Sequence, residues 1–133
     1  MGGLLTHLAI ASFGAGIFWL ILKRYYYGLA FFVGHLIPDL LDFGITAIIK
    51  KSLSPAVIMT SPYFRPLALF GHTFSNWLII AVILLAIIFL LYKFKKISKS
   101  KFSAIIISVI LVLSGIIVHL IIDKFVIERS YWI

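Results

Sequence analysis

The residues best able to do chemistry stand inside a run that is otherwise apolar. His35, Asp39 and Asp42 are spaced i, i+4 and i+7 within 34–42. On a helix these positions share a stripe about 60° wide, so two carboxylates and an imidazole can coordinate one cation. Without a cation the carboxylates would repel each other and one would bind a proton. Ionisable groups at membrane depth are costly and favour a functional role; the alternative is that Pro38 kinks the helix and leaves both aspartates in water.

A second imidazole–carboxylate pair, His119 and Asp123, repeats the i, i+4 spacing near the end of the chain. His7 and His72 stand at the starts of two further apolar runs, and with the first set they complete the histidines and aspartates of the sequence. Imidazole and carboxylate donors without thiolates favour a divalent ion, with Zn²⁺ first and Mn²⁺ or Fe²⁺ as alternatives. The donors are numerous enough for one ion or two.

Composition places these donors in a membrane protein. Of the 133 residues 63% are hydrophobic and 12% are charged, and the mean hydropathy is +1.19. A soluble domain of this length could not bury so much apolar surface. Twelve Lys and Arg against four acids give a net charge of +8. Because the cations flank the apolar runs, membrane lipids are the expected partners rather than nucleic acid. The absence of cysteine excludes disulfides and thiolate chemistry.

The elements that must position the donors are predicted to be transmembrane helices. Apolar runs long enough to cross a hydrocarbon core of about 30 Å lie at about 3–22, 27–49, 72–92 and 102–123. We therefore expect an all-α fold, a single transmembrane domain over 1–133, arranged as an antiparallel four-helix bundle. The second run is longer than one crossing needs, so its helix should kink at Pro38, tilt, or break near Gly44.

The long connection, 52–71, contains three prolines and cannot be one continuous helix. Since it remains apolar, we expect it to pack on the mouth of the bundle or lie at the interface, either as a lid or as a simple connector. Arg65 is its one cation. It is the candidate residue for binding an anionic headgroup, and the alternative is an ordinary contact with the lipid surface.

Four crossings bring the histidines and aspartates toward one face of the membrane, with His35 nearest the midplane. Seven of the twelve cations fall in the first and third connections and five on the other side. The larger group is Lys23, Arg24, Lys93, Lys95, Lys96, Lys99 and Lys101, and the smaller is Lys50, Lys51, Arg65, Lys124 and Arg129. The positive-inside rule then predicts a multi-pass protein of the cell membrane whose polar cluster faces the non-cytoplasmic side.

Three short motifs give the chain a resemblance to a known family. They are Thr6-His7-Leu8-Ala9, Leu36-Ile37-Pro38-Asp39 with Asp42 after it, and His119 with Asp123. In their order, and over nearly the whole chain, they resemble the YdjM-like membrane-bound metal-dependent hydrolases. The resemblance implies a hydrolase with a metal site that contains His7, Asp39, His119 and Asp123. That family has its second aspartate one residue before the position of Asp42, and two histidines in the motif where this chain has His72.

The leading hypothesis is a membrane-embedded metal-dependent hydrolase of a phosphoester in a lipid or lipid-linked substrate. Its predicted metal ligands are His7, Asp39, His72, His119 and Asp123, and its predicted catalytic residues are Asp42 and His35, one of them as general base. The same ligands would serve a protein that binds or transports divalent cations without hydrolysis, and a transporter of four spans would call for a homo-oligomer. A haem-binding bundle is the third hypothesis, against which the paired aspartates argue.

Overall fold

The computed structural model describes residues 2–127 of the chain, which form helices and short connections. The long helices are α1 (Gly2–Leu22), α2 (Tyr25–Asp39), α6 (Phe74–Lys93) and α7 (Lys99–Ile122). The shorter elements are α3 (Ile45–Lys50), α4 (Pro55–Met59), α5 (Phe64–Gly71) and the π-helical turns η1 (Leu40–Gly44) and η2 (Asp123–Ile127). The predicted all-α fold is confirmed.

Four segments of the described chain are long and apolar enough to cross a membrane. They are Leu5–Leu22, Tyr25–Lys50, Phe74–Lys93 and Lys99–Phe125. Large apolar side chains cover their outer faces; on α6, for example, Leu78, Val82 and Phe89 are all more than half exposed. Lipid chains can solvate such faces at no cost, whereas water cannot. This is the pattern of a multi-pass membrane protein.

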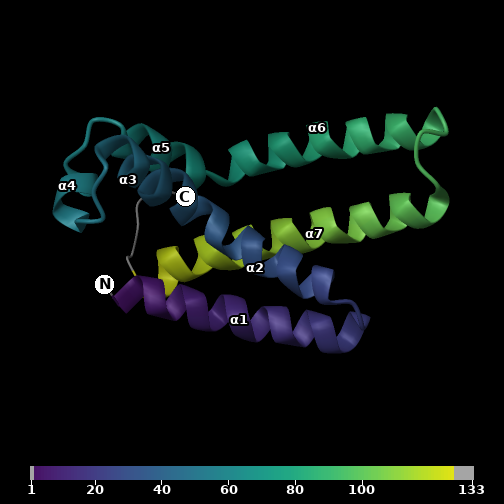
Figure 1. Cartoon of the computed structure of the whole chain (residues 1–133), viewed down its shortest axis with the longest axis horizontal. Helices are drawn as coiled ribbons and strands as arrows, with labels where there is room; N and C mark the ends of the chain where they lie inside the picture. The colour runs from purple at the N-terminus through teal and green to yellow at the C-terminus, as the bar shows by residue number, and fades with distance from the viewer. Residues whose placement is uncertain (1, 128–133) are drawn as a thin grey trace.

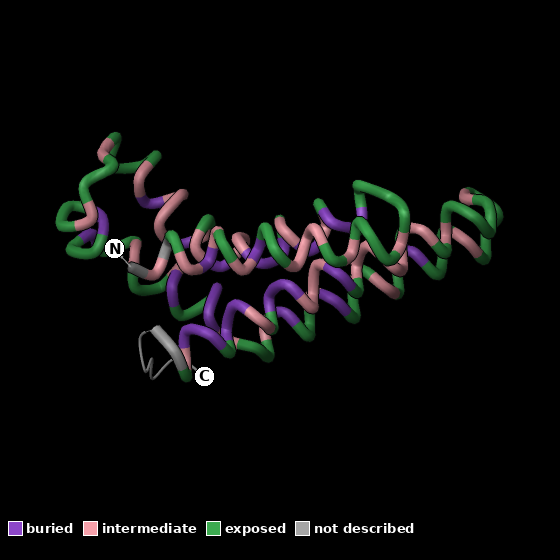
Figure 2. The backbone as a smooth tube through the Cα atoms, turned by 90° about the horizontal axis from the view of Figure 1, so that it is seen from below, coloured by how far each residue is buried: buried purple, intermediate pink, exposed green. Residues whose placement is uncertain are grey.

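The helices form an open bundle with α2 and α7 at its centre (Figure 1). α1 packs mainly against α2, and α2 packs extensively against α7. Among the long helices, α7 is the one with which α6 makes substantial contact. Successive long helices run in opposite directions, as predicted for an antiparallel bundle (Figure 1). Buried positions follow α2 and the second half of α7, while the end carrying the α6–α7 turn is largely exposed (Figure 2).

Two glycines let the central helices approach closely. A Cβ added to Gly34 of α2 would lie 2.2 Å from the carbonyl oxygen of Val112, and one added to Gly115 of α7 would lie 2.4 Å from that of Phe31. Small residues allow the backbones of membrane helices to meet in this way. The crossing lies one residue from His35 and one helical turn from His119, so it fixes the spacing of two site residues.

The second spanning segment is interrupted where the sequence predicted. Pro38 lies inside α2, and the π-helical turn η1 follows it at Leu40–Gly44 before α3 resumes the α-helix. Proline removes a backbone donor and crowds the preceding turn, which favours a local change in hydrogen bonding. Asp42 lies within η1, so the interruption helps to set the direction of its side chain.

The connection 52–71 folds into two short helices rather than an extended loop. Pro55 opens α4, where its missing N–H costs nothing, and Pro66 falls in the first turn of α5 for the same reason. α5 packs on η1 and α2, and its Ala68 and Gly71 are buried there. The connection is therefore packed on the bundle mouth, which was one of the two placements expected.

Two helix boundaries differ from those predicted. His72 caps the C-terminus of α5 and Thr73 is extended, so α6 begins at Phe74 and not at His72. α7 begins at Lys99 rather than 102 because Ser98 caps it, its hydroxyl oxygen accepting a hydrogen bond from the backbone N–H of Lys101. Arg129, which counted toward the predicted sidedness, lies outside the described residues.

Candidate metal centre

Seven histidine and aspartate side chains from separate parts of the sequence meet at one end of the bundle. α1 supplies His7, α2 supplies His35 and Asp39, η1 supplies Asp42, the end of α5 supplies His72, α7 supplies His119, and η2 supplies Asp123. From the number of membrane crossings, the sequence predicted that these residues would converge at one face. We call it the His/Asp cluster.

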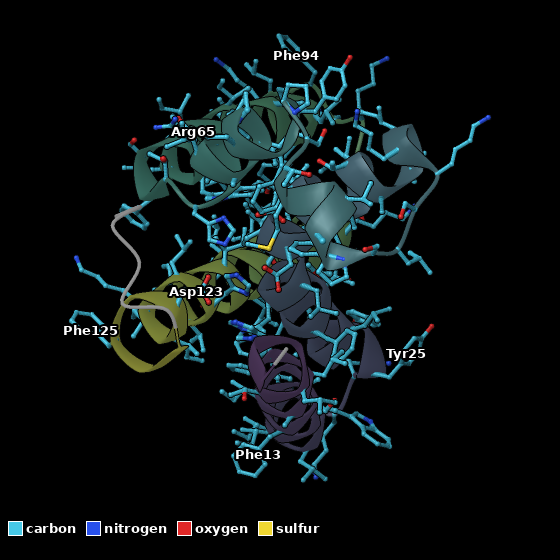
Figure 3. All side chains as sticks on the ribbon, turned by 90° about the vertical axis from the view of Figure 1, so that its left-hand side faces the viewer. Phe13, Tyr25, Arg65, Phe94, Asp123 and Phe125 are labelled. Atoms are coloured by element: carbon cyan, nitrogen blue, oxygen red, sulfur yellow. The ribbon has the colours of Figure 1, made fainter. Side chains whose placement is uncertain are left out.

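Asp123 is the residue around which three histidines gather. Its Oδ1 lies 2.8 Å from His7 Nε2. Its Oδ2 lies 3.1 Å from His72 Nε2 and 3.0 Å from His119 Nε2. In Figure 3 the Asp123 side chain is directed from the end of α7 toward the middle of the bundle. One carboxylate therefore links α1, α5 and α7 at the site.

Two hydrogen-bond acceptors on the Nδ1 side of the ring orient His72. Its Nδ1 lies 3.2 Å from the carbonyl oxygen of Ala68 and 3.6 Å from Asp42 Oδ2. Nδ1 is therefore the nitrogen that carries the proton, and Nε2 is left to face Asp39 and Asp123. This is how a carbonyl or carboxylate commonly fixes the tautomer of a metal-binding histidine. Burial alone would lower the pKa of His72, but the hydrogen bond to Asp123 and the charges of Asp42 and Asp39 raise it above its ordinary value.

His119 places a buried imidazole against two carboxylates. The residue is fully buried, and its Nδ1 has no hydrogen-bond partner among residues 2–127. Its Nε2 lies 3.5 Å from Asp39 Oδ1 and 3.0 Å from Asp123 Oδ2. Two carboxylates that face one buried nitrogen repel each other, and a metal ion among the three groups would offset that repulsion.

Four donor atoms have the mutual spacing of a metal site. They are Asp39 Oδ1, His72 Nε2, His119 Nε2 and Asp123 Oδ2, and each of the two histidine nitrogens lies 3.0–3.9 Å from both aspartate oxygens. Ligands about 2.0–2.2 Å from a tetrahedral zinc lie about 3.3–3.6 Å from one another. The four histidine–aspartate separations bracket this range, as expected for donors gathered around one ion. Asp39, His72 and His119 by themselves already present donors within 4.8 Å of each other.

A second group of donors adjoins the first and shares His119 with it. His7, His35 and His119 also present nitrogens within 4.8 Å of one another. His7 Nδ1 lies 3.1 Å from His35 Nε2, and the rings of His7 and His119 stack with centroids 4.2 Å apart. One consistent arrangement has His35 donating to His7, and His7 donating to Asp123. The group can thus hold a second ion or hold Asp123 in place.

Access to the cluster is asymmetric. His7, His35, Asp42, His119 and Asp123 are each exposed by 3% or less. The side chain of Asp39 is 31% exposed. Asp39 is therefore the most exposed residue of the cluster, and the remaining donors lie in the interior, where electrostatic interactions are strong.

Arg65, the predicted headgroup ligand, is exposed on α5 and lies on the outside of the molecule, apart from Asp123 (Figure 3). The catalytic and metal-binding roles assigned to the other residues from the sequence stay predictions. Thr46 was not among the residues predicted from the sequence. It is fully buried one turn beyond Asp42, and its hydroxyl has no hydrogen-bond partner among residues 2–127. Its position on the stripe of Asp39 and Asp42 was the signal that could have identified it.

Comparison of the chain with known protein families, with curated proteins and with solved structures finds no match.

Proposed function

We propose that the protein is a membrane-embedded, metal-dependent hydrolase. The observation that carries this proposal is the buried His119 Nε2, which faces carboxylate oxygens of both Asp39 and Asp123 within 3.5 Å. A structural ion pair needs only one of the two carboxylates, whereas a cation would be bound by all three groups at once.

The proposed ligands of the first ion are Asp39, His72, His119 and Asp123. Zinc is the ion we favour because the set combines imidazole and carboxylate donors, with manganese or iron as alternatives. His7 then orients Asp123, or with His35 and His119 holds a second ion. A divalent ion bound there supplies the chemistry of a hydrolase, since it lowers the pKa of a water molecule and polarises a phosphoryl or acyl oxygen.

Asp42 and His35 are our candidates for moving the proton, and their contacts also allow a positioning role. Asp42 Oδ2 faces His72 Nδ1, and His35 connects to Asp123 through His7. The variants Asp42→Asn and His35→Gln separate the two roles. Loss of a general base would lower kcat while metal affinity is retained. Loss of a group that positions a metal ligand would lower metal affinity about 10- to 100-fold.

A phosphoester in a lipid or lipid-linked molecule is the proposed substrate. A site built among spanning helices and open beside Asp39 suits a substrate whose polar group sits at the membrane surface. The buried polar side chains of the described chain all lie toward this end, in α1, in 35–72 and in 119–123. The α6–α7 end offers no comparable residues within 2–127, which favours hydrolysis over passage of a cation across the membrane.

The site is proposed to face the non-cytoplasmic side of the cell membrane. This follows from the seven-to-five distribution of cations between the two sides of the spans.

Hydrolysis is tested by incubating zinc-loaded protein in detergent with a panel of phospholipids and polyprenyl phosphates. Release of phosphate or headgroup by the wild type, with Asp39→Asn at background, is the expected result. No turnover across the panel, combined with metal-dependent ion flux in liposomes, would contradict the proposal and favour a transporter.

A further inference from the structure

An apolar groove runs along the membrane-facing side of the bundle between α6 and α7, with α2 as its floor. Its volume is about 440 Å³, within the range of about 300–1,000 Å³ for ligand pockets. The lining from α6 includes Trp77 and Leu84, and that from α7 runs from Ala104 to Ile116. All of its lining residues lie within segments that are long and apolar enough to cross a membrane.

The groove has almost no polar group to offer a ligand. The hydroxyl of Ser108 donates to the carbonyl oxygen of Ala104 at 3.0 Å. The indole Nε1–H of Trp77 donates to the carbonyl oxygen of Gly71 at 2.7 Å. Tyr26 also lines the groove, and its hydroxyl pairs with that of Tyr27. With these three polar groups engaged inside the protein, a hydrocarbon is the ligand whose chemistry matches the surface.

The groove also ends beside the His/Asp cluster. Ile37, Trp77 and Ile116 line it and belong to the apolar cluster under the site. Ile116 is three residues before His119, and Ile37 is two before Asp39. Fifteen residues separate Ala104 from His119, which is about 22 Å along a helix. A hydrocarbon chain in the groove would therefore place its polar end at the level of the cluster.

We infer that this groove binds one acyl chain of a phospholipid and so positions the headgroup for the His/Asp cluster. The inference rests on the proposed hydrolase function, because it makes the bound phospholipid the substrate. It adds that the length of the acyl chain is read between α6 and α7, along the stretch of the groove that runs from Ile116 back to Ala104.

A photoactivatable phosphatidylcholine tests this. The lipid carries a diazirine near the end of one acyl chain and is mixed in trace amounts into nanodiscs that hold the whole protein. After irradiation, the labelled peptides are identified by mass spectrometry. We expect labelling of the groove at Leu84 and Ala104 to saturate and to be competed by unlabelled phospholipid. Labelling at Phe13, exposed on the outside of α1, should instead rise in proportion to the probe.

The matched variants are Ser108→Phe and Ser114→Phe. Both serines lie on α7 and donate to the carbonyl one turn back, but Ser114 is not part of the groove lining. A phenyl ring in the groove overpacks it, so groove labelling should fall about tenfold in Ser108→Phe. It should remain at the wild-type level in Ser114→Phe.

Indistinguishable labelling of the groove and of Phe13 in the wild type would overturn the inference, even if Ser108→Phe fails to fold. The inference would also be overturned if cross-links between two copies of the protein showed that α6 and α7 form an interface between the copies. Retained groove labelling in zinc-free protein, together with no hydrolysis after zinc is restored, would support the acyl-chain site and refute the hydrolase.

Discussion

Replacing Gly115 with alanine tests whether the close crossing of α2 and α7 holds the His/Asp cluster together. The new Cβ would lie 2.4 Å from the carbonyl oxygen of Phe31 and 2.6 Å from the backbone nitrogen of His35, whereas ordinary contacts begin at 3.4 Å. The helices must therefore separate by roughly 1 Å (3.4 − 2.4), and overpacking of this kind costs about 1–3 kcal/mol. Because His35 and His119 flank the crossing, zinc affinity should fall about 10- to 100-fold as well.

The measurements are thermal unfolding in detergent and zinc affinity by competition with a chelating dye. Gly16→Ala is the matched control, because a Cβ at that position of α1 meets nothing within 4 Å. It should leave zinc affinity unchanged and stabilise the helix by up to about 1 kcal/mol. Equal stability of the two variants, or wild-type zinc affinity in Gly115→Ala, would refute the reasoning.

Three further predictions follow from the site and its setting. Because the pKa of His72 is raised in the folded state, its protonated form stabilises the metal-free protein below the ordinary pKa of about 6.5, and thermal unfolding should show this stability being lost as the pH rises through the raised pKa. Zinc affinity should fall as the pH is lowered, because protons compete with the ion for His72. Trp77→Phe removes the hydrogen bond to the carbonyl oxygen of Gly71 and should destabilise the protein by about 1 kcal/mol in thermal unfolding. A melting temperature equal to that of the wild type would contradict this prediction. In intact cells, a membrane-impermeant thiol reagent should label Ser54→Cys and leave Ser98→Cys unlabelled, and the reverse pattern would invert the proposed sidedness.

The spans and the convergence of the donors were predictable because a membrane restricts the possible structures. An apolar run near 20 residues must cross, and each crossing decides the end at which its polar residues lie. His7 and Asp123, 116 positions apart in the sequence, could for that reason be expected together, and their side chains lie 2.8 Å apart. The interruption after Pro38 was predictable from its missing donor.

The finer features depend on contacts that no local pattern contains. The carbonyl of Ala68 selects the tautomer of His72, but any residue could supply that carbonyl. The close crossing at Gly34 and Gly115 depends on the relative rotation of two helices. The groove beside α6 arises because α6 packs against α7 and makes no comparable contact with α1. That arrangement depends on how all the long helices of the bundle pack together.

The most direct test is elemental analysis of the purified protein after zinc supplementation and removal of loosely bound metal. The structure predicts one or two zinc ions per chain, bound at wild-type stoichiometry in Arg65→Ala and lost in His119→Ala while that variant still inserts and elutes as the wild type does. Absence of metal above the detergent blank in the wild type, or full occupancy in His119→Ala, would contradict the assignment of the His/Asp cluster as a metal centre.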